Sequence, residues 1–458
     1  MTTDFYANHL SEVNNVNRVV AGENICNEQG QLVLPEGTVI NQGALDSTLK
    51  FKLEKPLENS VVIENQFDED SLLQEIEKLF LADPNTSALW HDIADDGLVA
   101  ACCNVVCQDT LVAQKLTVLS LQFPKLFAQS VFCGVFAARM IADNNADPDL
   151  IIDAFIAGAL HDIGMLHLNP DFVLSQRSLN AEEWKVLQSH PLIGAAFAKS
   201  VPCLSDDVVK GIAQHHETID GTGYPAGKIA QQIHPIALTL QMLDSVWAIY
   251  TKQFKILERS LGDILPLIQM NSNYRHNNYA RALVVLFKKI PPTTHCLTPD
   301  TLVGDLVDFV LDQDKYITTF SEITAKISKT IGFRHGDKKL LGLQNTLIYI
   351  HVSLQQSGII NPAYMRWLEV VKAENLQHAY REVEDVNLML AEILFHIKRF
   401  KVHLALIQKA TKSPDIALPL KEVNTGLQQL RLGKPSEALT KYLPSSSLAH
   451  TEDTIRSA

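Results

Sequence analysis

The pattern of apolar and polar residues changes near residue 70 and separates an early part of short apolar runs from a long helical part. In the early part, β-branched runs between turn residues predict short strands over 17–21, 31–34 and 60–64. Residues 27–30 are the expected turn of a hairpin between the first two strands. A helix is expected from about Gln42, and residues 1–15 are expected to be a polar lead-in.

Beyond residue 70, apolar residues recur every three or four positions, which predicts amphipathic helices. The helix expected over 150–160 is apolar on all sides, so it is expected to be buried. Asn180 and Glu183 have the pattern of a helix N-cap, and the helix that opens there is expected to carry His190. One further helix is expected to begin at about residue 70, and two more are expected within 84–122. Single helices are expected over 125–143, 206–214, 235–250, 260–272 and 278–289.

These patterns predict a mainly α protein in three regions. Residues 1–68 form a small β-rich module, residues 69–292 an all-helical domain with its preceding helices, and residues 293–458 a C-terminal helical extension of unknown role. A chain of 458 residues has room for two or three domains of ordinary size.

Composition narrows the classes of function. A hydrophobic content of 46% and a charged content of 20% are typical of a globular protein with a large core. The formal net charge of −13 argues against general binding to DNA or to an anionic membrane. No run of about 18 apolar residues and no basic leader followed by an apolar segment is visible, so the cytoplasm is the expected location. The seven cysteines show no paired C-x-x-C spacing, and Cys102, Cys103 and Cys107, in an apolar helical run, are expected to be reduced core thiols rather than a metal site.

The residues that suggest chemistry are histidines and aspartates spaced by about one helix and one loop. They are His161-Asp162, His190, His215-His216 and Asp244, separated by 29, 25 and 28 residues. Neutral imidazole and carboxylate are suitable ligands for Fe, Mn, Zn or Ni. Several helices can each deliver a ligand to one centre, so the sequence predicts a metal cluster. A single His-Asp pair is more often structural, and the prediction rests on the whole set in this order.

Asp162 is the expected bridge within that cluster, because a carboxylate at a helix end can bind two metals through its two oxygens while His161 binds one of them. Two metals about 3.5–4 Å apart polarise a phosphodiester and activate water, so no Ser or Cys nucleophile is needed. Glu217 and Asp220 are expected to order their loop rather than to bind metal. His167 and His234 are expected to be surface or supporting groups.

These motifs resemble the HD-GYP domain, a bacterial signalling branch of the HD phosphohydrolase superfamily. The resemblance covers about 125–290, and residues 16–65 also resemble, more weakly, a small β module that often precedes such domains. The strings that carry it are His161-Asp162-Ile163-Gly164, His190-Pro191-x-x-Gly194, His215-His216-Glu217-x-x-Asp220-Gly221-x-Gly223-Tyr224-Pro225, and Asp244. The resemblance implies an all-helical core with two or three metals, often iron, and hydrolysis of cyclic di-GMP or a related cyclic dinucleotide.

By position in the family motif, His161, Asp162 and Asp244 match one metal centre. The other matches His190, His215 and His216, with Asp162 as the bridge. The cofactor expected is one or two divalent transition metals per chain, iron first, with manganese or zinc as alternatives.

The loop Gly223-Tyr224-Pro225 matches the substrate side of the family site and is implicated there in contacts with diguanylate cyclase domains. The expected partners are therefore a cyclic dinucleotide, a diguanylate cyclase domain or response regulator, and a second copy of the chain in a homodimer.

Several positions depart from the family pattern. Gln129 stands where the family has a histidine ligand, and Met165 stands where it has a phosphate-binding lysine. Leu238 and Trp247 replace an arginine and an aspartate. The usual basic patch is reduced to Lys252 and Lys255, which are the remaining candidates to contact the substrate phosphate.

Two hypotheses follow. The first is a metal-dependent cyclic dinucleotide phosphodiesterase in which His161 and Asp162 are catalytic. The second is a catalytically impaired module of the same fold that acts as a sensor or as an interaction partner. Hydrolysis of another phosphoester is a third alternative.

Overall fold

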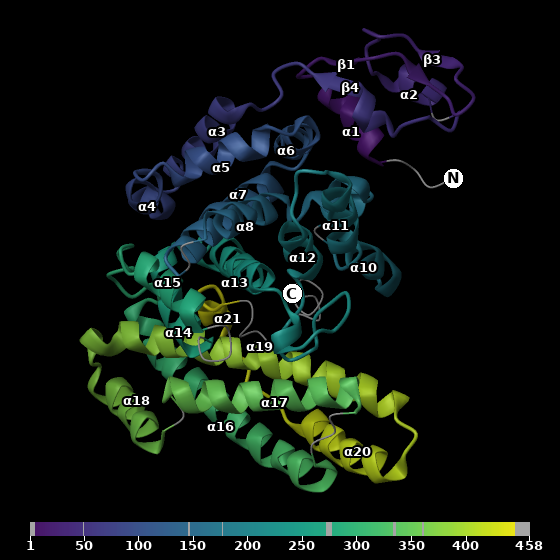
Figure 1. Cartoon of the computed structure of the whole chain (residues 1–458). Coiled ribbons are helices and arrows are strands. Elements are labelled where there is room, and N and C mark those ends of the chain that lie inside the picture. The colour runs from purple at the N-terminus through teal and green to yellow at the C-terminus, as the bar shows by residue number, and fades with distance from the viewer. Residues whose placement is uncertain are drawn as a thin grey trace. The chain divides into compact units, whose positions relative to one another are not determined.

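A computed structural model of the chain describes residues 5–48, 50–144, 147–175, 177–271, 277–332, 336–359 and 361–444. The described residues are mainly α-helical, as predicted (Figure 1). The chain forms two compact units. The first contains residues 1–216 and 234–244, and the second contains 217–233 and 245–458. The division into three regions expected from the sequence remains a prediction.

The first unit begins with a small module that corrects two expectations. The described part of 1–15 is not a polar lead-in, because helix α1 (Phe5–Val13) buries Tyr6, Leu10 and Val13, while residues 1–4 lie outside the described residues. The 27–30 turn joins β2 to β3, whereas β1 pairs antiparallel with β4. The two-residue strand β2 is too short to show an alternating pattern in the sequence. The elements are α1, β1 (Val19–Ala21), β2 (Ile25–Cys26), β3 (Leu32–Leu34), α2 (Gln42–Thr48), a 3-10 turn (Leu57–Ser60) and β4 (Val61–Ile63).

Helices build the rest of the first unit. Three helices, rather than two, cover 84–122, because Gly97 has a left-handed φ of 72° and Asp109 caps a new helix. His190 does not lie in the helix capped by Asn180, which ends at Leu187, but begins the next one. The helices are α3 (Glu69–Leu81), α4 (Pro84–Ala94), α5 (Leu98–Cys107), α6 (Thr110–Gln122), α7 (Pro124–Ala142), α8 (Pro148–Leu160), the 3-10 helix η2 (Ile163–His167), α9 (Pro170–Val173), α10 (Ala181–Leu187), α11 (His190–Ser200) and α12 (Asp206–Gln214).

Helices α7 and α8 form the centre of this unit and approach each other at two glycines. A Cβ atom on Gly158 would lie 2.5 Å from the Cα atom of Gly134, so neither position tolerates a side chain without a shift. The segments Pro124–Ala142 and Pro148–His167 are long and apolar enough to cross a membrane by length and composition. However, 67% and 72% of their apolar windows are buried in the fold, as is typical of core helices.

Lys115 on α6 joins the N-terminal module to the helical core. Its side chain is fully buried, with Nζ 2.5 Å from a Glu58 carboxylate oxygen and 3.1 Å from Nε2 of His167. The same ammonium group lies 3.1 Å from the centre of the Tyr6 ring. Burial and the charge of Lys115 lower the pKa of His167 to about 3, so its neutral imidazole can accept a hydrogen bond from the ammonium. His167 is therefore a partner of Lys115 in the structure.

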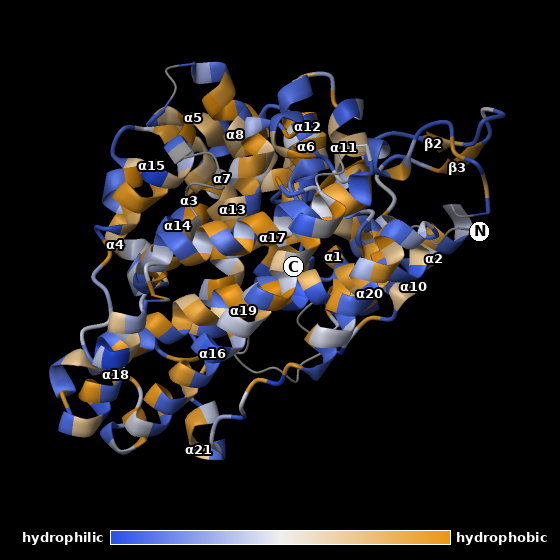
Figure 2. Ribbon diagram, turned by 90° about the horizontal axis from the view of Figure 1, so that it is seen from below, coloured by the Kyte–Doolittle hydropathy of each residue, from blue (hydrophilic) through white to orange (hydrophobic). Residues whose placement is uncertain are grey.

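The second unit contains the loop 217–233 and the C-terminal helices, whose apolar stripes are visible in Figure 2. In it, α16 packs against α19 and α20, and α17 packs against α19. Its elements are a 3-10 turn (Ala230–Gln232), the end of α13 (Pro235–Ile249), a π-helical turn (Tyr250–Phe254), a 3-10 turn (Leu261–Ile264), α14 (Leu265–Asn271), α15 (Asn277–Phe287), α16 (Asp300–Ile331), α17 (Lys338–Ser357), α18 (Pro362–Glu374), a 3-10 turn (Gln377–Ala379), α19 (Tyr380–Ala410), α20 (Pro414–Gln429) and α21 (Glu437–Thr440).

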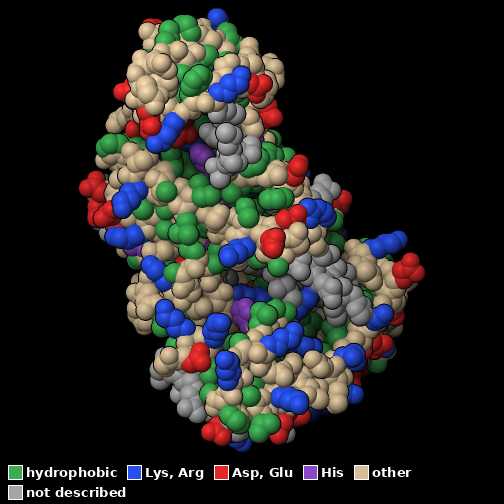
Figure 3. Space-filling view, turned by 90° about the vertical axis from the view of Figure 1, so that its right-hand side faces the viewer, with side chains coloured by type: hydrophobic (Ala, Val, Ile, Leu, Met, Phe, Trp, Pro, Cys, Tyr) green, Lys and Arg blue, Asp and Glu red, His purple; other side chains and the backbone are tan. Residues whose placement is uncertain are grey.

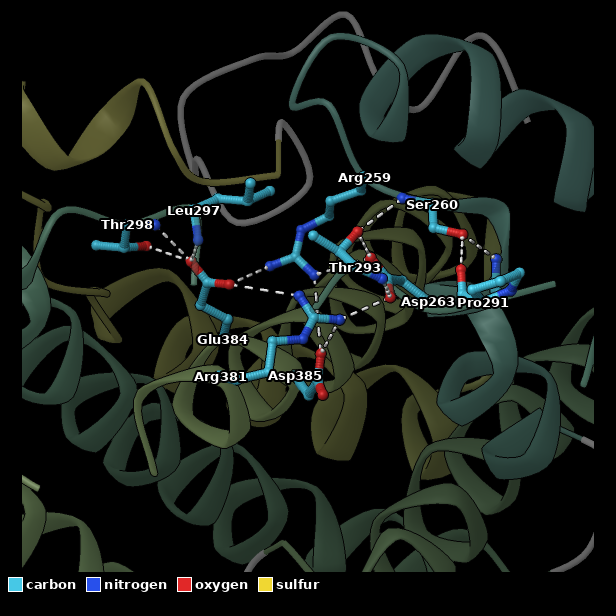
Figure 4. Close-up of polar contacts among 11 residues, drawn as sticks. Arg259, Ser260, Asp263, Pro291, Thr293, Leu297, Thr298, Arg381, Glu384 and Asp385 are labelled. Carbon is cyan, nitrogen blue, oxygen red and sulfur yellow. Dashed lines mark hydrogen bonds and ion pairs between the residues drawn. The ribbon is translucent and has the colours of Figure 1, made fainter. Parts of the chain in front are cut away.

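A buried ionic network fastens the segment 259–298 to α19 (Figure 4). One carboxylate oxygen of Glu384 accepts hydrogen bonds from the Thr298 amide at 2.6 Å and the Thr298 hydroxyl at 2.7 Å. Its other oxygen accepts from Arg259 at 3.0 Å. Arg381 in turn lies 2.8 Å from Asp263. Because the charges are paired and hydrogen-bonded, their burial is tolerated and the network has a structural role.

The Lys115 contact predicts a large loss of stability on truncation. Lys115→Met leaves the Glu58 carboxylate without its cation and is expected to lower the free energy of unfolding by about 2–4 kcal/mol, since removing one partner of a buried pair exposes the other to its desolvation cost. Urea denaturation measures the change. The exposed Lys125→Met is the control, and an equal effect of both variants would contradict the role given to Lys115.

Candidate functional site

Four side chains from separate parts of the first unit converge on one point. Asp162 follows the end of α8, His190 begins α11, and His215 and His216 follow the end of α12. One potential ligand atom from each lies within 4.8 Å of the others. Asp162, His190 and His215 are almost completely buried. The structure thus brings together four of the predicted metal ligands.

The imidazole rings are held by the ends of the preceding helices. The last carbonyl groups of a helix lack partners within the helix. His190 places Nδ1 2.8 Å from the carbonyl oxygen of Leu187, at the end of α10, and His215 places Nδ1 2.7 Å from that of Ile212. A proton on Nδ1 that is donated to a carbonyl leaves Nε2 as the atom that can bind a metal.

The Nε2 atoms do face the common centre. His190 Nε2 lies 3.2 Å from Asp162 Oδ1 and 3.2 Å from His215 Nε2. The rings of His215 and His216 lie 4.1 Å apart at their centres. Burial, followed by the charge of neighbouring imidazoles, lowers the pKa of both His215 and His216 well below the ordinary value. Both rings are therefore neutral, which is the form that ligates a metal.

His161 lies beside this cluster, and its ring is also held by a carbonyl group at the end of a helix. Its Nδ1 is 2.8 Å from the carbonyl oxygen of Gly158 in the last turn of α8. Its Nε2 is 3.3 Å from Asp162 Oδ2, and among the described residues this buried atom has no hydrogen-bond partner. Burial opposes a charged ring, but the carboxylates of Asp162 and Asp244 raise the pKa of His161 to about 9.

Asp162 concentrates negative charge in this buried place. Although burial acts in the opposite direction, His161 and His190 hold the pKa of Asp162 well below its usual range. A buried carboxylate needs a compensating cation. The neutral imidazoles of His215 and His216, the Nε2 atom of His190 and this carboxylate form a donor set that fits a divalent transition metal, and a metal bound there would replace the proton of His161 as the compensating charge.

Asp244 has a different neighbour. The side-chain amide of Gln129, on α7, donates a hydrogen bond to the Asp244 carboxylate on α13. Cys133, one helical turn further along α7, is fully buried, and burial and the nearby Asp244 and Asp162 raise the pKa of its thiol. An amide therefore occupies one carboxylate oxygen of Asp244. The roles of His161, of Asp244 and of the four clustered side chains as metal ligands remain predictions.

Two motif glycines allow the histidines to approach. A Cβ atom on Gly164, in the turn after Asp162, would lie 2.1 Å from the carbonyl oxygen of His190 and 2.9 Å from the amide of Gly194. The turn therefore touches the first turn of α11 backbone to backbone. This close contact explains why the motif has glycine at both positions and how Asp162 reaches His190.

The carboxylates of the loop after His216 order that loop, as predicted. Buried Glu217 accepts hydrogen bonds from the backbone amides of Ala226 at 2.7 Å and Lys228 at 2.8 Å. Asp220 accepts from the Thr218 hydroxyl at 2.6 Å and the Thr222 amide at 3.0 Å. Both carboxylates are engaged by their own loop.

The predicted substrate-binding residues, Gly223, Tyr224, Pro225, Lys252 and Lys255, all lie in the second unit. Lys252 and Lys255 are exposed, and the ammonium of Lys255 lies 5.1 Å from the Tyr250 ring centre. Their role toward substrate stays a prediction.

Two of the positions that depart from the family pattern are used for packing. Met165 and Leu238 are 9% and 5% exposed, so both lie in the apolar core of the first unit. His234 is a supporting group, with Nε2 3.3 Å from Asp207 and its backbone amide bonded to Gln214. The carbonyl groups that orient the histidines were missed from the sequence, although each lies three residues before its histidine at a helix end.

Comparison with known proteins agrees with this arrangement. Residues 115–276, about a third of the chain, match the HD domain family. The chain is 40% identical over 92 residues to a cyclic di-GMP phosphodiesterase of Pseudomonas aeruginosa, covering 20% of the chain and 22% of that relative. It is 32% identical over 78 residues to a 3'3'-cGAMP-specific phosphodiesterase of Vibrio cholerae, covering 16% of the chain and 17% of that relative.

The chain thus spans less than a quarter of the length of these curated relatives, at 22% and 17%. Among solved structures it is similar to an HDG"Y"P protein of Bdellovibrio bacteriovorus, with a TM-score of 0.31 and 16% identity over 59% of this chain and 94% of the other.

The Gly164 contact predicts that a single methyl group disturbs the site. Gly164→Ala forces the turn away from α11 and is expected to destabilise the fold by about 1–3 kcal/mol, as overpacking does. Metal bound per purified chain is expected to fall at the same time, because Asp162 and His190 separate. Elemental analysis and thermal unfolding measure the two effects. Gly304→Ala, whose Cβ meets ordinary contacts, is the control; unchanged metal content in Gly164→Ala would contradict the geometry.

Proposed function

We propose that the protein is a metal-dependent phosphodiesterase that hydrolyses cyclic di-GMP or a related cyclic dinucleotide, because residues 115–276 match the HD domain family and their motifs resemble those of the HD-GYP family. The observation that carries the proposal is the convergence of Asp162, His190, His215 and His216, with imidazoles oriented by helix-end carbonyl groups. Relatives named for cyclic di-GMP and for 3'3'-cGAMP support either substrate.

The residues of the chain would act by holding charge in place. Asp162 would bridge, and His190, His215 and His216 would bind on one side. His161 and Asp244 would bind on the other. A divalent transition metal at this site, with iron proposed first and manganese or zinc as alternatives, would polarise the phosphodiester and lower the pKa of the attacking water. Burial of these side chains excludes bulk water and strengthens their electrostatic effect on the developing charge.

The proposed setting is bacterial second-messenger signalling in the cytoplasm. The proposed macromolecular partners are a diguanylate cyclase domain or a response regulator, and a second copy of the chain. Gly223, Tyr224 and Pro225 would face the substrate, with Lys252 and Lys255 as the proposed contacts to its phosphates.

A second candidate function is supported by the contact between Gln129 and Asp244. An amide that already bonds Asp244 is a poor ligand, so the centre expected to use Asp244 lacks one imidazole. Met165 and Leu238, buried among apolar residues, offer no charge to a phosphate. Each lost charge-assisted contact costs on the order of 1.5–3 kcal/mol. The alternative is therefore a catalytically impaired module that binds metal or ligand and signals to a partner protein.

Substitution of the bridging carboxylate tests the main proposal. Asp162→Ala is expected to abolish turnover of cyclic di-GMP and 3'3'-cGAMP and to reduce bound metal. The Asp149→Ala variant, on the exposed first turn of the same helix, is expected to keep both. Fe, Mn and Zn per chain are measured after aerobic and anaerobic purification. No metal under any loading condition would overturn the enzyme proposal, and one metal without turnover would support the impaired module.

Replacing the amide with an imidazole tests the second candidate. Gln129→His supplies the ligand that the first centre lacks, so bound metal is expected to rise by about one per chain and turnover is expected to increase. Gln108→His, at an exposed position between α5 and α6, is the control for adventitious metal binding to a new histidine. An unchanged metal content with an intact fold would show that Gln129 is not what limits the centre.

A further inference from the structure

The second unit contains a cavity of about 230 Å³ that the proposed chemistry does not use. It lies where the loop after His216 meets the first turns of α17 and the C-terminal half of α19. The residues that line it are Gly221, Thr222, Lys338, Lys339, Gly342, Leu343, His403, Leu406 and Ile407. Its floor is therefore apolar, and its polar groups are cationic or neutral.

The two lysines of the cavity are exposed, and burial and the charge of Arg399 lower the pKa of its histidine, His403. Neither the ammonium groups of Lys338 and Lys339 nor the imidazole of His403 has a hydrogen bond or an ion pair within the described part of the chain. The lining contains no aspartate or glutamate. Figure 3 shows Lys and Arg side chains gathered around a hollow on one face of the molecule. The formal net charge of the chain is −13, so the charge of this region is opposite in sign to that of the whole chain.

The position of the two lysines is unfavourable for the helix itself. They occupy the first turn of α17, where the helix dipole is positive and disfavours a cation. Asp337, which precedes the two lysines in the chain, is the N-cap, and its oxygen accepts hydrogen bonds from the amides of Lys339 at 3.0 Å and Leu340 at 3.2 Å. Helix stability alone therefore does not favour lysine at these two positions, and an anion held there would offset the unfavourable interaction with the helix dipole.

The wall of the cavity is the loop that leads into Gly223-Tyr224-Pro225. Thr222 accepts a hydrogen bond from Arg399 of α19 at 2.7 Å, and Asp220 accepts one from the Thr346 hydroxyl of α17 at 2.9 Å. The Asp220 carboxylate is buried, and although burial opposes it, Arg399 helps to lower its pKa. The same two helices thus shape the cavity and hold the loop.

We propose that this cavity binds a small organic anion, a carboxylate or phosphate head with an apolar body, and that the bound anion stiffens the loop 218–229. The head would contact Lys338, Lys339 and His403, and the apolar body would pack on Leu343, Leu406 and Ile407. The volume lies below the ~300–1,000 Å³ of pockets for drug-sized ligands, so a small metabolite fits the cavity better than a cyclic dinucleotide does. Binding at this cavity does not require the protein to be an active phosphodiesterase.

The test uses the full-length protein and two probes, inorganic phosphate and phenylphosphonate, which combines an anionic head with an apolar ring and has no ester bond to hydrolyse. Isothermal titration calorimetry measures affinity. Hydrogen–deuterium exchange measures the amides of 218–229. Phenylphosphonate is expected to bind more tightly than phosphate and to slow exchange in the loop.

The decisive variant is Lys338→Glu/Lys339→Glu, compared with Lys409→Glu/Lys421→Glu, which makes the same change in charge at exposed positions outside the lining. The first is expected to weaken phenylphosphonate binding at least tenfold while keeping or raising Tm, because glutamate suits the first turn of a helix. The second is expected to bind like the wild type.

Three outcomes would overturn the proposal. No saturable binding of phenylphosphonate at millimolar concentrations would remove the site. Equal affinity in Lys338→Glu/Lys339→Glu and the wild type would place the anion elsewhere, the metal cluster included. Binding without any change of hydrogen–deuterium exchange in 218–229 would contradict the proposed effect of the anion on the loop. None of these results depends on turnover of a cyclic dinucleotide.

Discussion

The first unit depends on one electrostatic constraint, the burial of the Asp162 carboxylate among imidazoles. A carboxylate removed from water must be compensated. Carbonyl groups at helix ends hold Nδ1 of His190 and His215, so the Nε2 atoms of these two rings face the carboxylate. His161 carries the remaining proton, with a pKa raised to about 9. The helix ends thus set the direction of the donor atoms, and a metal cation bound there would replace the His161 proton as the counter-charge of Asp162.

Other positions of the predicted centre do not supply a metal ligand or a positive charge. Gln129 satisfies Asp244 with a neutral amide, where an imidazole would leave the carboxylate for a metal. Met165 and Leu238 fill space in the core. These replacements are compatible with the fold, because each satisfies a local demand of packing or hydrogen bonding. They supply no positive charge that would bind a doubly charged dinucleotide tightly. The structure is therefore compatible with both proposed functions, an enzyme and an impaired signalling module.

The C-terminal helices have a defined relation to the motif loop of their own unit. Asp220 orders that loop and is bonded by Thr346 of α17, and Thr222 is bonded by Arg399 of α19. The network around Glu384 anchors α19 to the segment 259–298. The extension is thus a scaffold for the loop that contains Gly223-Tyr224-Pro225, and a cavity at the same place offers a means of acting on it.

The sequence by itself determined the helical class, the order of the ligand residues and the loop-ordering roles of Glu217 and Asp220. These follow from local rules, namely apolar spacing, N-caps such as Asn180, and residue chemistry. Local rules gave wrong predictions where the contact partners of a segment are distant in the sequence, or where a strand or helix is short. The hairpin of β2 and β3, helix α1 and the start of α11 at His190 were misassigned for this reason. Only the tertiary structure decided that Gln129 bonds Asp244, that Gly164 touches His190, and that Lys115 ties the N-terminal module to the core. Each of these contacts joins residues on different elements, and no spacing along the chain encodes their approach.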